Sequence, residues 1–282
     1  VFRTRCCQRS LLQLRGERRA SASPRSQTQR RGSFAAGRRE PARVLLRAAA
    51  SASRSAAMSS GAAAVEVYVK AKPGTGATVL GDCPFSARVL LTLEEKAIAH
   101  TRHLIDFSDK PQWFLEANPE GKVPVLHHEG KWIADSDVIC EHLEGGAFPD
   151  ARALSPADES TRQVGAAFFG AFVKFFTNGD AAAEPALRDG LAAEVKAIDA
   201  ALQGKTFLGG DDVCSVDLAL YPKLRHMAVA CGHYKGFAVP QECAALASYM
   251  KAMAKRPSVV DTYYPDEYIL EGWQPKLGLS NL

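Results

Sequence analysis

Alternation of apolar and polar residues begins at position 65, where the run VEVYVK over 65–70 has a period of two. This period predicts a β-strand. A loop follows as far as Gly81. Pro84 then opens a segment with helical apolar spacing, and proline is favoured at the first position of a helix. The pattern therefore predicts a strand, a loop and a helix in succession.

The same patterns predict further strands and helices over the next 60 positions. Short strands are predicted at 103–105, 123–126 and 132–133, a brief helix at 111–116, and a further helix from Ser136 to about Glu144. The order β-α-β-α-β-β-α is that of a thioredoxin-like α/β domain, which we place at 61–146. Periodicity by itself supports only a small α/β domain.

Strand patterns end at the segment GGAFP over 145–149, and after it the apolar residues have helical spacing. Apolar residues recur at helical intervals in four segments, which are 157–177, 184–203, 216–232 and 242–254. Residues 152–282 are therefore predicted to form an all-α C-terminal domain. The residues from Pro265 onward are expected to be an irregular tail that packs only through Tyr268, Leu270 and Trp273.

Charge is distributed unevenly along the chain. Residues 1–58 hold 14 Arg against two acids, Glu17 and Glu40, for a net +12, so the rest carries about −8 of the total +4. A segment rich in Arg, Ser and Ala without a continuous apolar core is typical of a transit peptide, and we expect 1–58 to be one and to be disordered. Chloroplast import is the preferred prediction, with the mitochondrion second. If translation starts at Met58, the protein would be cytosolic instead.

The acidic balance of the remainder argues against a nucleic-acid partner. No apolar run approaches the roughly 20 residues of a membrane span, so no constitutive transmembrane helix is expected. The seven cysteines lack zinc-finger or disulfide-framework spacing, which indicates a reducing compartment and no metal site. His127 and His128 are expected at a strand end that faces solvent.

Cys83 is the candidate nucleophile. It immediately precedes Pro84, at the start of the first predicted helix, where free N–H groups and the helix dipole favour a thiolate. The alternative is an inert buried thiol. Ser86 stands where a dithiol oxidoreductase has its second cysteine, so an oxidised Cys83 needs an external thiol, and glutathione is the abundant candidate.

Two further features fit a glutathione site. Val123-Pro124 begins a strand, and a cis-proline there would leave the preceding backbone free to pair with an extended peptide; an edge-strand proline is the alternative. Asp135-Ser136 lies at a strand-to-helix turn, where a hydroxyl and backbone N–H groups can hold a carboxylate, or where the pair is only a helix cap.

Several sequence blocks together resemble plant dehydroascorbate reductase, a branch of the glutathione transferase superfamily. They are LGDCPFS at 80–86, LLTLEEK at 90–96, SDKPQWF at 108–114, PEGKVP at 119–124 and ADSDVI at 134–139. In the helical half, Asp217-Leu218 and Pro222-Lys223-Leu224 match most clearly. The Cys-Pro-Phe-Ser motif alone also occurs in omega-class transferases and in intracellular chloride channel proteins.

The resemblance implies a role for each matching residue. Cys83 would be the nucleophile, and Lys70 and Asp82 would hold dehydroascorbate, although Lys72 rivals Lys70 because the loop to Cys83 is one residue longer than usual. Glutathione, a co-substrate and not a permanently bound cofactor, would be bound by Lys110, Val123, Asp135 and Ser136, unless Lys110 only faces solvent. The reaction would convert two glutathione and dehydroascorbate to glutathione disulfide and ascorbate. A monomer is implied.

The resemblance also exposes one departure. The superfamily commonly has Ser or Thr three residues before Asp217, whereas this chain has Cys214 there. Cysteine caps a helix less well, so we expect a loss of stability of about 1 kcal/mol or a shifted cap, without an effect on chemistry.

Two other functions remain open at this stage. The same Cys83 would serve a general glutathione-dependent thiol transferase of the omega or glutaredoxin type. A non-enzymatic, membrane-associating protein like the intracellular chloride channels is the second alternative. Arg88, Glu94, Glu95 and Lys96 in the first predicted helix oppose membrane insertion.

Overall fold

The computed structural model describes residues 64–156 and 158–277; the predicted transit peptide lies outside them. The first half is built on a four-stranded sheet with the strand order β2-β1-β3-β4. β1 runs parallel to β2 and antiparallel to β3, which is itself antiparallel to β4. The strands are β1 (Glu66–Lys70), β2 (Thr101–Ile105), β3 (Val125–His128) and β4 (Lys131–Ala134).

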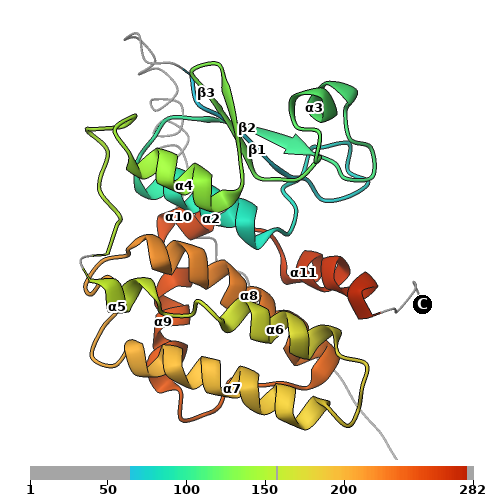
Figure 1. Ribbon diagram of the computed structural model, residues 1–282, viewed down its shortest axis with the longest axis vertical. Helices are drawn as coiled ribbons and strands as arrows, with labels where there is room; N and C mark the ends of the chain where they lie inside the picture. The colour runs from blue at the N-terminus through green and yellow to red at the C-terminus, as the bar shows by residue number, and fades with distance from the viewer. Residues whose placement is uncertain (1–63, 157, 278–282) are drawn as a thin grey trace, which may run out of the picture. The chain divides into compact units, whose positions relative to one another are not determined.

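The sheet has helices on both of its sides (Figure 1). The alternating side chains of β1 enter two different cores. Val67 and Val69 are fully buried with apolar residues of α2 (Pro84–Glu95) and α4 (Ser136–Glu144). Tyr68 points to the other face and packs with Phe114 of α3 (Gln112–Ala117). The sheet therefore lies between α2 and α4 on one side and α3 on the other.

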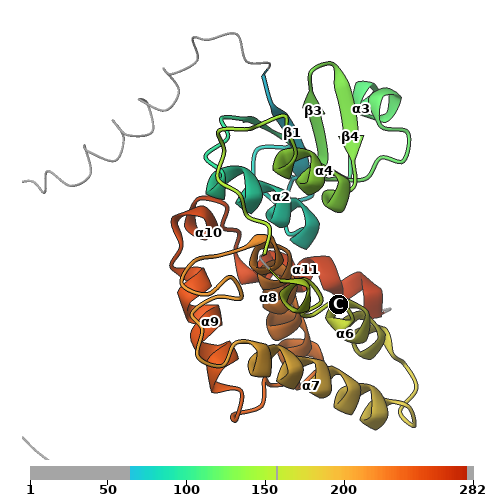
Figure 2. The same cartoon turned by 60° about the vertical axis from the view of Figure 1, so that its left-hand side comes forward.

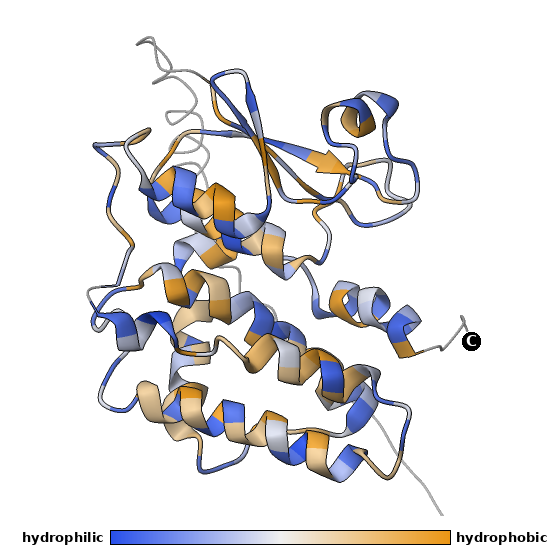
Figure 3. Ribbon diagram, viewed as in Figure 1, coloured by the Kyte–Doolittle hydropathy of each residue, from blue (hydrophilic) through white to orange (hydrophobic). Residues whose placement is uncertain are grey.

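The second half consists of helices gathered around α8, which packs against α2, α6, α9 and α11 (Figure 2). Polar and apolar residues are interspersed along α7 (Figure 3), as expected of a helix with one buried face, whereas α6 is apolar along most of its length. The helices are α5 (Glu159–Arg162), α6 (Phe168–Thr177), α7 (Glu184–Ala201), α8 (Ser215–Lys235), α9 (Ala244–Ala254), α10 (Pro257–Asp261), α11 (Asp266–Trp273) and the 3₁₀-helix η1 (Gln274–Leu277).

Two sequence predictions about this half are wrong. The segment 157–177 is not one helix, because Gly165 adopts a φ of +70° and separates α5 from α6. A Cβ at Gly165 would lie 2.8 Å from Leu220, so the chain turns sharply where it meets α8. The expected irregular tail is helical: Ile269 and Trp273 of α11, four residues apart, are buried on one face. Its brevity and the flanking prolines concealed this spacing.

The N-cap of α8 is at the position expected from the sequence and is not shifted. Cys214 is the N-cap residue, and its backbone N–H donates to the Asp217 carboxylate at 2.8 Å. Asp217 is fully buried and also accepts hydrogen bonds from the backbone N–H groups of Leu208 and Gly209. Asp217 therefore joins the loop before α8 to the first turn of the helix.

Candidate active site

Cys83 is the N-cap residue of α2, with extended backbone and with Pro84 at the first helical position. Its sulfur accepts a hydrogen bond from the backbone N–H of Ser86 at 3.4 Å. The first turn of α2 contains no acidic residue. An N–H donor and the positive end of the helix dipole both favour a negative charge on this sulfur.

The other cysteines differ from Cys83 in their exposure. Cys83 is partly exposed, whereas the remaining four in the described part of the chain are buried. Burial raises the pKa of each of these thiols, to about 11 for Cys214 and to about 12 for Cys231. Within 64–156 and 158–277, Cys83 is thus the thiol with access to a substrate.

The loop before Cys83 is hydrogen-bonded to β1. The backbone N–H of Gly81 donates to the carbonyl of Lys70 at 2.8 Å, and a Cβ at Gly81 would lie 2.4 Å from the carbonyl oxygen of Ala71. This close approach brings Asp82 to Lys70, whose Nζ lies 2.7 Å from Oδ1 of Asp82. Burial raises the pKa of Asp82, and Lys70 opposes that shift. The structure thus joins Lys70, Asp82 and Cys83 in one place.

Lys72, the alternative to Lys70 for binding dehydroascorbate, contacts α11 instead of Asp82. Its Nζ pairs with Glu271 of α11 at 2.5 Å and lies 4.0 Å from the ring centroid of Tyr268. The pair with Glu271 raises the pKa of Lys72. Of the two lysines, Lys70 is the one in contact with the residue that precedes the nucleophile.

The sequence reasoning missed the contribution of α11 and η1 to this site. A Cβ at Gly272 would lie 2.0 Å from Oδ2 of Asp82, so only glycine allows α11 to pass this closely. Burial and Lys70 lower the pKa of Lys276, while charges on Asp82 and Cys83 oppose that shift. The four-residue apolar spacing that ends at Trp273 was the signal that could have predicted this helix, but not its position.

A buried hydrogen-bonded chain connects α11 to α8. The indole N–H of Trp273 donates to Nδ1 of His226 at 2.9 Å, and Nε2 of His226 lies 2.9 Å from the hydroxyl of Tyr264. An indole can only donate, so Nδ1 is unprotonated and the neutral ring carries its proton on Nε2. Burial lowers the pKa of His226 to about 3, which keeps the ring neutral.

Two of the predicted glutathione-binding residues, Lys110 and Val123, lie in the loops before and after α3. The Val123–Pro124 peptide bond is cis, and Val123 is partly exposed. Lys110 lies beside the same segment, since a Cβ at Gly121 would be 3.2 Å from its Nζ, and this Nζ is 4.3 Å from the ring centroid of Phe107. Lys110 and Val123 are therefore on neighbouring stretches of chain.

Asp135 and Ser136 begin α4. Asp135 has a φ of +73°, and its carboxylate accepts a hydrogen bond from the backbone N–H of Asp137 at 2.7 Å. Ser136 is buried at the first helical position. Asp135 thus caps the helix, and this cap leaves its second carboxylate oxygen without a described hydrogen bond.

Asp106, which the sequence analysis did not consider, connects two loops of the site. Its buried carboxylate accepts hydrogen bonds from the N–H of Gly74 at 2.8 Å and from both the N–H and the hydroxyl of Ser108 at 2.9 and 2.6 Å. The hydrogen bond from the Ser108 hydroxyl lowers the pKa of Asp106. Asp106 therefore ties the loop after β1 to the loop that carries Lys110.

Across 64–156 and 158–277, no group of three or more His, Cys, Asp or Glu side chains is arranged to hold a metal ion. The prediction that His128 faces solvent is wrong: it is buried, and its Nδ1 lies 3.0 Å from Nε2 of His142. Among the described helices, none is both long and apolar enough to cross a bilayer.

Comparisons with known proteins agree with this architecture. The sequence profile of the glutathione S-transferase N-terminal domain matches residues 82–145. Glutathione S-transferase DHAR2 of Arabidopsis thaliana is 44% identical over 76% of this chain and 99% of its own length. The chloroplastic glutathione S-transferase DHAR3 of the same plant is 38% identical over 78% of this chain and 83% of its own.

A solved structure gives the same result. The crystal structure of Chlamydomonas reinhardtii dehydroascorbate reductase superposes with a TM-score of 0.68 at 33% identity, and the match covers 76% of this chain and 98% of that one. The predicted combination of a thioredoxin-like domain and an all-α domain is thereby confirmed. This chain belongs to the glutathione transferase superfamily and, within it, to the group of dehydroascorbate reductases.

Proposed function

We propose that this protein reduces dehydroascorbate to ascorbate at the expense of glutathione, with Cys83 as its nucleophile. The observation that carries the proposal is the partly exposed Cys83 sulfur at the start of α2, beside the Lys70–Asp82 pair. The relatives named dehydroascorbate reductase support the choice of substrate.

In the first half-reaction the Cys83 thiolate attacks a carbonyl carbon of dehydroascorbate and forms a carbon–sulfur bond. Lys70 and Lys276 supply positive charge near the oxygen that becomes negative, and Asp82 accepts a hydrogen bond from a substrate hydroxyl. A water oxygen, or the sulfur of glutathione, then attacks Cys83. The carbon–sulfur bond breaks, its electron pair leaves with ascorbate, and Cys83 becomes a sulfenic acid or a mixed disulfide with glutathione.

In the second half-reaction glutathione restores the thiol. A sulfenic acid reacts with one glutathione to give the mixed disulfide and water, and a second glutathione attacks that disulfide and releases glutathione disulfide and the Cys83 thiolate. Ser86 provides no resolving thiol. Lys110, the Val123 backbone, Asp135 and Ser136 would hold glutathione for these steps. A covalent enzyme form between the half-reactions predicts ping-pong kinetics.

We further propose import into the chloroplast and a monomeric state. The Arg-rich, acid-poor composition of 1–58 and the chloroplastic relative support the former. Relatives of this chain include both chloroplastic and cytosolic proteins, so the cytosol remains the alternative location. Imaging of the full chain fused to a fluorescent protein, and light scattering of the purified protein, test the two points.

The test of the function is the glutathione-dependent formation of ascorbate by the full chain, corrected for the uncatalysed reaction. Wild type and a Cys243→Ala control should turn over alike, whereas Cys83→Ser should lose at least about a thousandfold in rate. Full activity in Cys83→Ser would refute the mechanism. Reduction of a glutathione mixed disulfide but not of dehydroascorbate would assign a general thiol transferase, and inactivity on both would favour a binding role.

A further inference from the structure

Ser86 has a buried hydroxyl without a partner, three residues after the nucleophile. The residue is 2% exposed, and its Oγ is the only buried side-chain nitrogen or oxygen without a hydrogen-bond partner in the part of the chain that the structure describes. Buried polar groups in folded proteins nearly always have a partner, because leaving one unpaired is unfavourable. This exception lies next to the sulfur of Cys83, which accepts a hydrogen bond from the backbone N–H of Ser86.

The position of Ser86 in α2 explains why the helix itself offers its hydroxyl no partner. Thr92, farther along the same helix, is also buried, and its hydroxyl donates to the carbonyl of Arg88, four residues before it, at 2.9 Å. This is a common partner for a buried hydroxyl inside a helix. Ser86 is the third residue of α2, so the residue four positions before it belongs to the preceding loop. The hydroxyl of Ser86 therefore stays available to another group.

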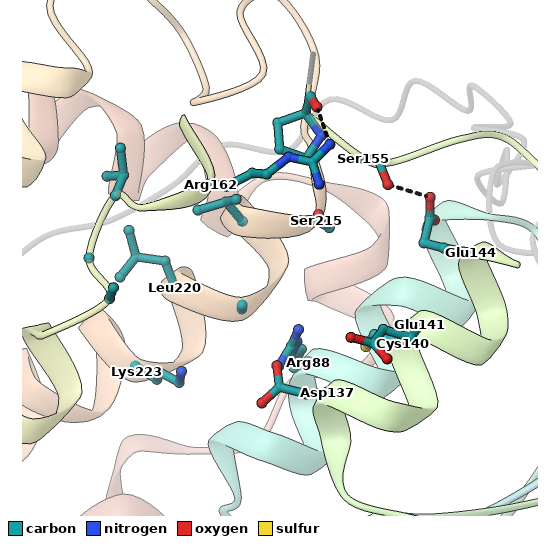
Figure 4. A pocket seen from close by; sticks show the side chains of 16 residues that line it. Arg88, Asp137, Cys140, Glu141, Glu144, Ser155, Arg162, Ser215, Leu220 and Lys223 are labelled. Carbon is teal, nitrogen blue, oxygen red and sulfur yellow. Dashed lines mark hydrogen bonds and ion pairs between the residues drawn. The ribbon is translucent and has the colours of Figure 1, made fainter. Parts of the chain in front are cut away.

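Polar side chains elsewhere around α2 are paired. Together with α4 and α8, α2 lines a cavity of about 500 Å³ (Figure 4). In this cavity Arg88 forms an ion pair with Asp137, and the carboxylate of Glu144 accepts a hydrogen bond from the hydroxyl of Ser155 at 3.2 Å. Ser86 does not line the cavity. The unpaired hydroxyl is thus a feature of the end of α2 that carries the nucleophile.

The reaction places a new oxygen atom at this end of the helix. When a water oxygen attacks Cys83, the product is a sulfenic acid, with the oxygen bonded directly to the sulfur. That sulfur lies 3.4 Å from the backbone nitrogen of Ser86. An oxygen that extends from the sulfur comes within reach of the side chain of the same residue. The hydroxyl would then gain the acceptor that it lacks in the reduced protein.

The sulfenic oxygen benefits from a donor when it leaves. Attack by glutathione forms a sulfur–sulfur bond and breaks the sulfur–oxygen bond, whose electron pair leaves with the oxygen. The oxygen takes up the proton that the glutathione thiol loses, and water is released. A hydrogen-bond donor aimed at an atom that gains negative charge lowers the barrier to such a step.

We propose that the hydroxyl of Ser86 donates a hydrogen bond to the oxygen of the Cys83 sulfenic acid and so promotes its departure when glutathione attacks. This inference rests on the proposed function and requires the route through the sulfenic acid. It makes Ser86 a catalytic residue of the second half-reaction that takes no part in the first. A hydroxyl thus assists resolution at the position where a dithiol oxidoreductase has its second cysteine.

Ping-pong kinetics of the full chain test the two half-reactions separately, because kcat/KM for each substrate reports on its own half-reaction. Ser86→Ala should lower kcat/KM for glutathione at least about tenfold and leave kcat/KM for dehydroascorbate unchanged. Thr92→Val, which removes another buried hydroxyl of α2, is the matched control and should change neither value. Since Ser86→Ala removes only an unpaired group, the variant should unfold at no lower urea concentration than wild type.

A second measurement isolates the step without dehydroascorbate. One equivalent of hydrogen peroxide converts Cys83 to the sulfenic acid, and mass spectrometry follows the formation of its mixed disulfide with glutathione. Ser86→Ala should slow this step at least about tenfold. When the mixed disulfide is prepared beforehand, no oxygen leaves, so its reduction by a second glutathione should proceed at the same rate in the variant and in wild type.

Equal rates of wild type and Ser86→Ala in the sulfenic acid reaction would overturn this inference. An equal slowing of the mixed-disulfide reaction would also overturn it, because the hydroxyl would then act on the sulfur and not on the oxygen. Both results leave the proposed function standing. If wild type forms no ascorbate, the proposed function fails, and the peroxide experiment still decides whether Ser86 contacts the sulfenic oxygen.

Discussion

Two helices of this protein begin with a cysteine as the N-cap residue, but the two cysteines have different roles. Cys83 caps α2 and Cys214 caps α8, both with extended backbone, and three residues later stand Ser86 and Asp217. Cys83 is partly exposed and its first turn carries no acid. Cys214 is buried, and burial and Asp217 raise the pKa of its thiol to about 11. A cysteine at a helix N-terminus therefore becomes a nucleophile only when solvent reaches it and the first turn of its helix carries no carboxylate.

The first turns of α2 and α8 also differ in whether they contribute to the chemistry or to the stability of the protein. The first turn of α2 contributes a reactive sulfur, whereas that of α8 contributes a buried carboxylate that holds three backbone N–H groups. Changes at α2 should affect reaction rates, and changes at α8 should affect the free energy of unfolding. The four predictions that follow test this division.

The largest effect is expected at α8. Asp217→Ala leaves the backbone N–H groups of Leu208, Gly209 and Cys214 without their acceptor, and it should lower the free energy of unfolding by about 4 kcal/mol. Urea denaturation of the variant and the wild type measures this change in the free energy of unfolding. Asp261→Ala, at an exposed position, is the control and should change stability by less than about 0.5 kcal/mol. Equal effects of the two substitutions would contradict the structural role of Asp217.

At α2, Ser86→Asp would reproduce the arrangement of α8 next to the nucleophile. A carboxylate three residues after Cys83 disfavours its thiolate, so alkylation of Cys83 by iodoacetamide at pH 7 should slow about a hundredfold. Ser86→Asn introduces a side chain of similar size without the charge and should slow it much less. If both variants react at the same rate, the missing acid does not explain the reactivity of Cys83.

Acid should act on the stability of the helical half through His226. The pKa of its ring is about 3 in the folded protein and near 6.5 when unfolded, so protons bind the unfolded state preferentially. Stability is therefore complete above pH 6.5 and falls as the pH drops toward 3, by about 2 kcal/mol at pH 5. Unfolding free energies of wild type and His226→Gln at pH 8 and 5 measure it. An equal acid loss in the variant would exclude His226 as the cause.

The smallest effect is expected from Cys214→Ser. Serine is the better cap, but its hydroxyl would be buried at a position where the thiol is 4% exposed, so the two contributions should offset to within about 1 kcal/mol. The rate of ascorbate formation should be that of wild type. A large loss of rate would show that Cys214 takes part in the chemistry, against the comparison drawn above.

The sequence predicted features that depend on neighbouring residues more reliably than those that depend on distant contacts. The start of α2 at Pro84, the strand before it and the limits of α4 at Ser136 and Glu144 were all found from local patterns. The choice between Lys70 and Lys72 could not be made from spacing, because it depends on the isolated bridge between Ala71 and Leu80 and on Glu271, far along the chain.

The same limit explains the errors in the helical half. The contact between Gly272 and Asp82 joins positions that no local pattern relates, and the turn at Gly165 depends on Leu220 of another helix. The buried chain of Trp273, His226 and Tyr264 likewise exists only once α11 has docked on α8. Local propensity predicted neither Lys276 nor Gly272 as part of the site.

The most direct test of the account follows modification and activity together in the wild-type chain. Native protein is treated with a limiting amount of iodoacetamide at pH 7, each cysteine is quantified by mass spectrometry, and the remaining rate of ascorbate formation is measured. We expect the rate to fall in proportion to the fraction of Cys83 modified, while Cys140, Cys214, Cys231 and Cys243 stay unmodified. Activity that persists after Cys83 is fully alkylated would contradict the assignment of the nucleophile.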